Sequence, residues 1–297
     1  MFRDFSAESN DNTFYVTGTC NNSCLMCSQP PVNEEDLSEI YTRNMEVLEH
    51  APKDLPCIGI SGGEPTMAGE FLFRLLDEIR IKYPTALIHF LTNGRKFADD
   101  TYVEKLLKYG YHNMVFGIPL HSDYFKDHDK ITQRKGAFHE TLRGLYNLAN
   151  YNANIELRIV INKLNYERLE QMADYIQYNL PFVESIAFMG MEITGYAVNN
   201  ASCIWIPPED YQHNLQRAVL KLFRWNLPVY IYNIPLCILP SNLHQFSCKS
   251  ISNWKRYYCH ECEECIVKEK CCGLFSTSKW QSQAIHPIIQ CGSFFPQ

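Results

Sequence analysis

Three cysteines lie within eight residues near the start of the chain. Cys20, Cys24 and Cys27 form the pattern C-x3-C-x2-C inside the run TGTCNNSCLMCSQP. Closely spaced thiolates select iron–sulfur clusters or zinc over hard cations. A 4Fe–4S cluster takes four ligands, so three protein thiolates leave one iron open to a small molecule, and an open position marks a reactive metal centre. The pattern predicts a reactive iron–sulfur site, with a loop zinc site as the alternative.

A glycine-rich turn follows one strand-and-helix unit later, where residues 61–66 read SGGEPT. Its two glycines let the backbone approach a ligand closely, and its glutamate can accept hydrogen bonds from an ammonium group. Alone, this sequence is usually a tight strand-to-helix turn. In this order and spacing, the two motifs resemble the radical S-adenosylmethionine (radical SAM) superfamily. In that family the GGEP motif holds the amino group of S-adenosylmethionine (SAM), which here implies Gly62, Gly63, Glu64 and Pro65.

The resemblance implies further contacts to SAM. Met26 takes the place of a frequent aromatic residue and would pack against adenine, because thioethers adapt to aromatic faces. Asn93 lies in a TNG sequence that is often near the ligand, or else forms a plain Asn-Gly turn. Arg158 matches an arginine that binds the SAM carboxylate, or else forms a salt bridge at a strand end. Glu192 would face the SAM ribose or the substrate, or else is an ion-paired or helix-capping carboxylate. No catalytic residue is assigned.

The chain departs from the family pattern at the end of the fourth expected strand. Many relatives carry Ser-x-Asp there, whereas the run IPLHSD puts Pro119 and His121 in those places. The hydroxyl contact to SAM is missing in that register, although Ser122 and Asp123 follow directly and can substitute. We expect His121 to be a hydrogen-bonded residue of the site rather than a base.

A second group of cysteines lies in the last third of the chain. The part C-x2-C-x5-C-x-G resembles the SPASM/twitch extension of radical SAM enzymes, which carries one or two auxiliary 4Fe–4S clusters. We expect one auxiliary cluster, because too few cysteines fit the two-cluster pattern. The expected ligands are Cys237, Cys262, Cys265 and Cys271. Cys259 and Cys272 are alternatives, Cys248 or Cys291 would complete a second site, and a structural zinc knot is the competing interpretation.

Composition limits the classes of protein. The chain has 297 residues, 13 cysteines and a formal net charge of −6 without a basic block, so we expect no nucleic-acid partner. No apolar run reaches membrane-span length, and the first residues lack a signal-peptide core, so we expect no membrane partner and a cytoplasmic location. A reducing compartment disfavours disulfides, and clustered thiols there bind metals or take part in catalysis.

The elements that must position these motifs alternate along the chain. Strands are expected over residues 13–19, 57–61, 86–91, 113–120, 155–161 and 185–191, with amphipathic helices between them. Six such repeats predict an α/β fold, a partial (β/α)6 TIM-like barrel whose chemistry lies at the carboxyl ends of its strands. A helix from Pro207-Pro208 and a strand over 228–233 follow. The expected domains are an extension over 1–12, the core over 13–205 and a twitch/SPASM-like domain over 206–297.

Three stretches (128–149, 189–197 and 250–265) sharpen the resemblance to the radical SAM maturases of His-Xaa-Ser repeat peptide systems. That resemblance implies reductive cleavage of SAM to a 5′-deoxyadenosyl radical, hydrogen abstraction, and cross-link or thioether formation in a ribosomally made peptide. An external electron donor of the flavodoxin or ferredoxin type is implied as well. We expect no separate N-terminal leader-binding domain. The alternatives are an enzyme of a small-molecule cofactor or nucleoside pathway and a non-catalytic, zinc-stabilised binding module.

Overall fold

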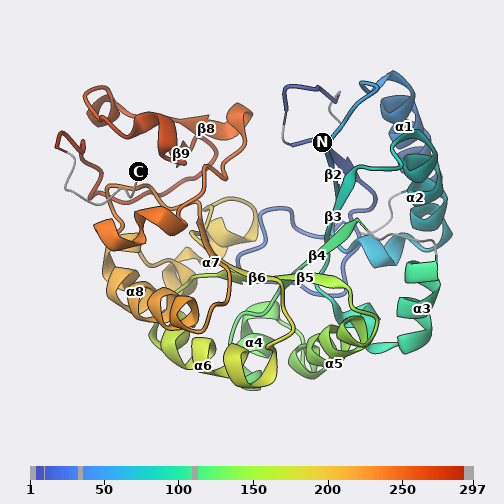
Figure 1. Cartoon of the computed structure of the whole chain (residues 1–297), viewed down its shortest axis with the longest axis horizontal. Helices are drawn as coiled ribbons and strands as arrows, with labels where there is room; N and C mark the ends of the chain where they lie inside the picture. Colours follow the sequence, from blue (N-terminus) through green and yellow to red (C-terminus); the bar gives the residue numbers. More distant parts are fainter. Residues whose placement is uncertain (1–4, 10, 33–35, 109–112, 291–297) are drawn as a thin grey trace. The chain divides into compact units, whose positions relative to one another are not determined.

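The structure is a computed structural model that describes residues 5–9, 11–32, 36–108 and 113–290 (Figure 1). Its main sheet has seven strands in the order β1-β2-β3-β4-β5-β6-β7. The pairings β1–β2, β2–β3, β3–β4 and β6–β7 are parallel. The strands are β1 (Thr13–Tyr15), β2 (Cys57–Ser61), β3 (Leu87–Leu91), β4 (Met114–Pro119), β5 (Asn154–Val160), β6 (Ser185–Met189) and β7 (Val229–Tyr232). This sequential order confirms the predicted α/β, TIM-like partial barrel, with one strand beyond the six repeats.

Helices connect the strands. They are α1 (Leu37–His50), α2 (Glu70–Lys82), α3 (Asp100–Lys108), α4 (Phe125–Thr132), α5 (Ala137–Asn150), α6 (Leu169–Asn179), α7 (Tyr196–Ile204) and α8 (Pro208–Arg224). Local signals fix several starts: Asp36 accepts hydrogen bonds from the backbone of Ser38 and Glu39 ahead of α1, and a proline occupies the first turn of α8. The sequence did not predict α4 or α7, which are only eight and nine residues long.

Short segments complete the chain. The 3-10 turns are η1 (Pro65–Ala68), η2 (Arg95–Ala98), η3 (Tyr166–Arg168), η4 (Ser241–Phe246), η5 (Asn253–Lys255), η6 (His260–Cys262) and η7 (Lys268–Lys270). Two short strands, β8 (Arg256–Tyr257) and β9 (Leu274–Phe275), pair antiparallel. Small segments of this kind cannot bury a large apolar core, in line with the expected cysteine-rich end.

Alternation along the strands separates a buried face from a face that holds polar groups. In β2, Ile58 and Ile60 are fully buried, whereas Cys57, Gly59 and Ser61 are partly exposed. Successive strand residues point to opposite faces, so burying both isoleucines stabilises this strand by about 1.5–3 kcal/mol each. The face that is not buried is available for polar side chains at the strand ends.

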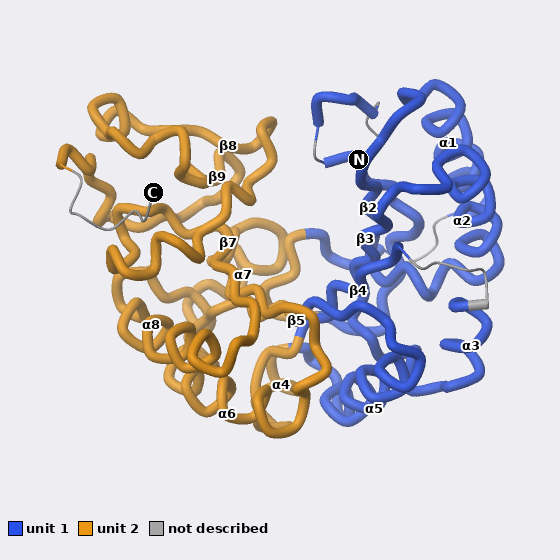
Figure 2. Tube along the Cα trace, in the orientation of Figure 1, with its two compact units in different colours: residues 1–23, 29–119, 132–156 blue, residues 24–28, 120–131, 157–297 orange. Residues whose placement is uncertain are grey.

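The chain divides into two compact units, coloured separately in Figure 2. Unit 1 comprises residues 1–23, 29–119 and 132–156, and unit 2 comprises residues 24–28, 120–131 and 157–297. The cysteine loop changes unit after Ser23, and β5 contributes residues to both units. The domain boundary expected at residue 205 stays a prediction, because this division follows contacts and does not isolate the C-terminal segment.

None of the helices in the described ranges is long and apolar enough to cross a bilayer.

Candidate functional site

The glycine-rich turn of unit 1 packs backbone to backbone against the segment that leads to Cys20. The amide of Gly63 donates to the Thr17 carbonyl (2.6 Å), and the amide of Glu64 donates to the Thr19 carbonyl (2.8 Å). A Cβ added to Gly62 would lie 2.4 Å from the Thr17 oxygen, and one added to Gly63 would lie 2.4 Å from the Thr19 oxygen. Only glycine fits this approach, so the turn directly positions the chain at the first cysteine.

Glu64 is 1% exposed, and its carboxylate joins two strand ends. One oxygen accepts from the Thr66 hydroxyl (2.6 Å), the Thr66 amide (3.2 Å) and the Thr92 hydroxyl (2.6 Å). The other accepts from the Asn93 amide (2.7 Å). Burial raises the pKa of this carboxyl, and the hydrogen bonds from Thr66, Thr92 and Asn93 oppose that rise. Four donors already occupy the carboxylate, so its direct contact with an ammonium group stays a prediction.

A network of side-chain hydrogen bonds holds the loop around Cys20, and most of these bonds were not predicted from the sequence. The Asn93 amide group donates to the Asn21 side-chain oxygen (2.5 Å) and lies 3.9 Å from the Cys20 sulfur. Arg95 donates to the Asn21 carbonyl (2.6 Å) and to the Asn22 side chain (2.8 Å). Only the position of Arg95, directly after the TNG sequence, could have indicated this role.

Two features orient Arg95 itself. Its guanidinium forms an ion pair with Glu140 of α5 (2.6 Å), and its side chain is 8% exposed. In the same turn Phe97 is fully buried and makes an edge contact with Phe116, 5.4 Å between ring centres. In α5, Gly144 has no Cβ, and one there would lie 2.2 Å from the Gly94 oxygen. The helix therefore packs closely enough to fix this arginine.

The other two cysteines of the triplet belong to unit 2. The amide of Cys27 donates to the Cys24 carbonyl (3.0 Å), and the Cys27 carbonyl accepts from the Tyr196 amide at the start of α7 (2.9 Å). Leu25 donates from its backbone to Ile131 of α4 (2.9 Å). These bonds use the two helices that the sequence did not predict, so α4 and α7 position the second half of the cysteine loop.

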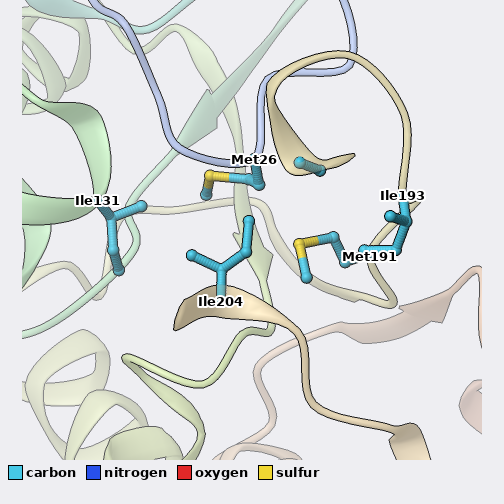
Figure 3. Packing of buried hydrophobic residues seen from close by; sticks show 6 residues of the cluster. Met26, Ile131, Met191, Ile193 and Ile204 are labelled. Atoms are coloured by element: carbon cyan, nitrogen blue, oxygen red, sulfur yellow. The ribbon is translucent and has the colours of Figure 1, made fainter. Parts of the chain in front are cut away.

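Met26 lies in an aliphatic cluster, shown in Figure 3. The residue is 8% exposed. The buried members of the cluster are Met26, Ile131, Met191, Ile193, Ala197 and Ile204, and Cys24 and Leu25 pack against it. An apolar, polarizable surface beside a cysteine loop suits an aromatic ring. The structure thus provides an apolar setting for the predicted adenine contact, which itself stays a prediction.

Arg158 and Glu192 both have partners within unit 2. The Arg158 Nε donates to the Met189 thioether (3.4 Å). The Glu192 carboxylate forms an ion pair with Lys255 (2.9 Å) and accepts from the Thr277 hydroxyl. For Glu192 this is the ion-paired alternative named above. The contacts of both residues with SAM stay predictions.

The end of β4, where the chain departs from the family pattern, is held by two other contacts. Asp123 forms a two-point ion pair with Arg168 (2.6 and 2.9 Å), so its carboxylate braces the loop. His121 is buried, and its backbone amide donates to the His128 Nδ1 (3.2 Å). Burial, followed by the neighbouring His128, lowers the pKa of His121 to about 3. The ring is therefore neutral near pH 7, and its buried Nδ1 has no hydrogen-bond partner among the described residues. The expectation that His121 is a hydrogen-bonded residue of the site rather than a base stays a prediction.

The four cysteines expected to hold an auxiliary cluster line one pocket of unit 2. The pocket has about 340 Å³ of empty space, part of it open to solvent, and its lining includes Cys237, Cys262, Cys265 and Cys271. The lining is largely apolar, since Leu236, Val267 and Cys271 form a small buried cluster. These four thiols come from a stretch of 35 residues. Their spacing in the sequence would not by itself bring them to one pocket.

Among the pocket cysteines, Cys271 has two hydrogen bonds to its sulfur. The backbone amides of Leu236 and Gly273 donate them, both at 3.5 Å. The thiol of Cys272, followed by these backbone donors, lowers the pKa of Cys271 to about 6, whereas burial raises the pKa of Cys237 to about 11. Gly273 has φ +72°, and a Cβ there would lie 2.8 Å from the Arg256 side chain. The glycine of the C-x-G pattern is therefore required by the fold.

The alternative cysteines lie elsewhere. Cys272 is fully buried with Ile251 and Phe275, outside the pocket lining. Cys248 does not line the pocket either. The Cys259 sulfur lies 3.6 Å from that of Cys262, and burial raises the pKa of Cys259 to about 12. Cys291 lies outside the described residues.

Both groups of donors are thiols, which suit an iron–sulfur cluster and also suit zinc. Thiolates around one zinc ion, at about 2.3 Å from it, stand about 3.8 Å apart. Across the described parts of the chain, no three His, Cys, Asp or Glu side chains are placed to share a single ion. The Cys259 and Cys262 sulfurs lie 3.6 Å apart. The residues at the C-terminal pocket therefore fit a cluster by their chemistry, and the auxiliary cluster itself stays a prediction.

A family comparison agrees with this geometry. The Radical SAM superfamily model matches residues 14–176, which is 163 of 297 residues. The chain therefore belongs to the Radical SAM superfamily and is an enzyme of that class. The Fe-coproporphyrin III synthase of Methanosarcina barkeri (strain Fusaro / DSM 804) is 32% identical over 164 residues, which cover 54% of this chain and 39% of that protein.

Solved structures share the fold at lower identity. SuiB of Streptococcus suis bound to S-adenosylmethionine is 14% identical with a TM-score of 0.60, covering 76% of this chain and 51% of SuiB. SuiB bound to the precursor peptide SuiA is 12% identical with a TM-score of 0.58, covering 77% and 49%. AnSMEcpe with bound AdoMet and the Cp18Cys peptide is 16% identical with a TM-score of 0.56, covering 74% and 62%. The chain thus spans about half the length of SuiB.

Proposed function

We propose that this enzyme cleaves SAM reductively and abstracts a hydrogen atom from a ribosomally made peptide, which then forms a cross-link or a thioether. The observation that carries the proposal is the second set of four thiols around one pocket, in a chain of the Radical SAM superfamily. Bond formation between two peptide atoms removes two hydrogen atoms, one as an atom and one as a proton and an electron. A second redox site suits that requirement.

The proposed roles follow from the contacts of each residue. Cys20, Cys24 and Cys27 hold the first 4Fe–4S cluster, and Cys237, Cys262, Cys265 and Cys271 hold one auxiliary cluster. When bound, the first cluster and SAM supply a 5′-deoxyadenosyl radical, and the auxiliary cluster supplies a site for the second electron. The residues of the chain bind, orient and exclude water around these groups.

The SAM contacts are proposed on the same basis. We infer that the turn formed by Gly62, Gly63 and Glu64 receives the SAM ammonium. Three of the four described donors to Glu64 bond its Oε1, and its Oε2 accepts only from the Asn93 amide among them. Arg158 receives the carboxylate, since a guanidinium matches its geometry. Met26 packs against the adenine ring.

A peptide substrate is supported by the fold neighbours. SuiB and anSMEcpe, which share this fold, have each been solved with a bound peptide. The stretches 128–149, 189–197 and 250–265 support a His-Xaa-Ser repeat peptide as the particular substrate. A one-electron donor of the flavodoxin or ferredoxin type and a cytoplasmic location complete the proposal, because reduced clusters and free thiols need a reducing compartment.

One observation favours a second candidate. The match to Fe-coproporphyrin III synthase supports an enzyme of a small-molecule cofactor pathway. The two candidates share the SAM chemistry and differ in the substrate, so the substrate decides between them.

The test begins with the anaerobically reconstituted full chain. We expect about eight irons and eight sulfides per chain, and cleavage of SAM to 5′-deoxyadenosine after reduction. Zinc without labile sulfide would overturn the radical chemistry. The reduced enzyme is then incubated in parallel with His-Xaa-Ser repeat peptides and with iron tetrapyrroles that are precursors of coproporphyrin III, and products are identified by mass spectrometry. A loss of two hydrogen masses in a peptide supports the proposal, whereas formation of iron coproporphyrin III alone favours the second candidate.

A further inference from the structure

The loop between β6 and α7, residues 190–195 (the bridge loop), connects the two cysteine regions of unit 2. On one side, Met191 and Ile193 pack in the same cluster as Met26 of the cysteine loop (Figure 3). Directly after the loop, Tyr196 donates from its backbone to the Cys27 carbonyl (2.9 Å), and Asn200 donates to the Leu25 carbonyl (3.0 Å). The bridge loop and the start of α7 therefore set the position of the chain at the second and third cysteines.

On the other side, the same loop is fastened to the C-terminal segment. Ile193 donates its amide to the Ser278 hydroxyl (3.0 Å) and accepts from the Lys279 amide (2.9 Å). Glu192 pairs with Lys255 (2.9 Å) and accepts from the Thr277 hydroxyl. Two successive residues of the loop thus make four contacts with residues that lie 63 to 86 positions further along the chain.

The contacts that Glu192 makes with the C-terminal segment lead on to the small sheet of β8 and β9, which lies beside the auxiliary pocket. Lys255 directly precedes β8, and its carbonyl accepts from the Ser276 amide (2.8 Å) directly after β9. Gly273, directly before β9, lines the pocket and donates its amide to the Cys271 sulfur. A chain of packed and hydrogen-bonded groups therefore runs from the pocket through Lys255 and Glu192 to the cysteine loop.

The ion pair that links them is partly withdrawn from water. The side chain of Glu192 is 13% exposed and that of Lys255 is 23% exposed. The Lys255 ammonium also lies 5.0 Å from the centre of the Phe275 ring, in β9. Charge-assisted hydrogen bonds of this kind are stronger than surface ion pairs, which solvent screens.

We propose that Glu192 and Lys255 are positioning residues that couple the C-terminal segment to the Cys24–Cys27 half of the cysteine loop. This rests on the proposed function in one respect, that the loop holds a cluster which binds SAM. Glu192 acts through Met191, Ile193 and α7 and does not touch SAM. Ordering of the C-terminal segment, for example by a bound peptide, is thereby communicated to the SAM site.

A double-mutant cycle on the reconstituted full chain tests the coupling. Glu192→Gln and Lys255→Met should each raise amide hydrogen exchange in residues 24–28 and 191–200 about tenfold, the loss expected for a bond to a charged group. The two single variants should weaken SAM binding equally, and the double variant should be no worse than either. Lys255→Arg should restore both readouts.

The control is Lys221→Met. The Lys221 side chain is 27% exposed, similar to that of Lys255, and pairs across α6 and α8 with the more exposed Asp174 (2.7 Å) and Glu170 (3.4 Å). This substitution should leave both readouts unchanged. If a Glu192 or Lys255 variant fails to fold, Ser278→Ala removes the bond to the Ile193 amide, together with the bond to the Trp280 carbonyl (2.8 Å), and should raise exchange in the same two segments.

Two outcomes would overturn the coupling. One is higher exchange in residues 191–200 with unchanged exchange in residues 24–28. The other is weaker SAM binding in Glu192→Gln while Lys255→Met behaves as the wild type, since Glu192 would then contact SAM itself. Because exchange is measured without turnover, a coupled chain that never cleaves SAM would refute the proposed function and leave the coupling intact.

Discussion

The two cysteine regions are built in opposite ways. The triplet Cys20, Cys24 and Cys27 lies on one loop, and side chains and helices from distant parts of the sequence hold that loop in place. In the C-terminal pocket the cysteines themselves come from distant parts of the sequence, because Cys237 lies 25 positions before Cys262. The Cys271 sulfur there accepts from the backbone amides of Leu236 and Gly273. A short loop needs external support to be a rigid site, whereas converging segments support one another once they meet.

Removing a cysteine gives the largest effect and tests whether the regions have separate roles. Cys24→Ala should abolish SAM cleavage, at least about a thousandfold, because an incomplete ligand set does not hold the first cluster. Cys271→Ala should lower iron by about four per chain and keep SAM cleavage while product formation on a peptide is lost. Iron counting and 5′-deoxyadenosine assays measure both, and loss of SAM cleavage in Cys271→Ala would contradict separate roles.

Glycine substitutions compare the backbones of the two regions. Gly63→Ala places a methyl group 2.4 Å from the Thr19 oxygen and should cost about 3 kcal/mol of unfolding free energy. Gly273→Ala meets the Arg256 side chain at 2.8 Å and adds backbone strain, so a similar cost of about 2–3 kcal/mol is expected. Gly136→Ala, with φ +85° and open space around its Cβ, isolates the strain alone, about 1–2 kcal/mol.

Urea unfolding of the three variants measures these differences. A cost for Gly63→Ala no larger than that for Gly136→Ala would mean that the turn relaxes away from Thr19.

Arg95 tests whether the first region depends on external support. Arg95→Met removes bonds to Asn21, Asn22 and Glu140 and should weaken SAM binding by about 2 kcal/mol, with a change in the spectrum of the reduced cluster. Arg95→Lys should restore only part of the affinity, since an ammonium cannot reproduce the fork of a guanidinium. Normal SAM affinity in Arg95→Met would show that the loop holds itself.

His121 gives an effect that emerges only below pH 7, a dependence of stability on pH. Its pKa falls to about 3 in the folded chain because it is buried, while the unfolded chain keeps the ordinary value of 6.5. Between these values the unfolded state binds more protons, so stability falls as the pH is lowered, by up to about 1.4 kcal/mol per pH unit. His121→Gln should flatten this part of the profile, measured by denaturant unfolding from pH 7 to pH 4. An unchanged slope would mean that the ring is accessible to protons when folded.

The sequence alone determined the fold class and the reaction class, because both rest on local patterns. Alternating apolar residues define strands such as β2, whose bounds were predicted to the residue. The motif C-x3-C-x2-C, together with GGEP, indicates the class of reaction. Short helices such as α4 and α7 span only eight and nine residues, below the window in which a helical period is recognised, so they were missed although they hold Leu25 and Cys27.

Only the tertiary structure decided how the motif residues are used. The sequence predicts that Glu64 binds SAM, and the fold also gives its carboxylate four hydrogen-bond donors. For Glu192 the sequence left a SAM or substrate contact and an ion pair open, and the fold supplies an ion pair with a lysine 63 positions away. Arg95 carries no motif and still holds the cysteine loop. A carboxylate or a guanidinium takes its role from the partners that the fold brings within hydrogen-bond distance, and many of those partners, such as Thr92 for Glu64 and Lys255 for Glu192, lie far away in the sequence.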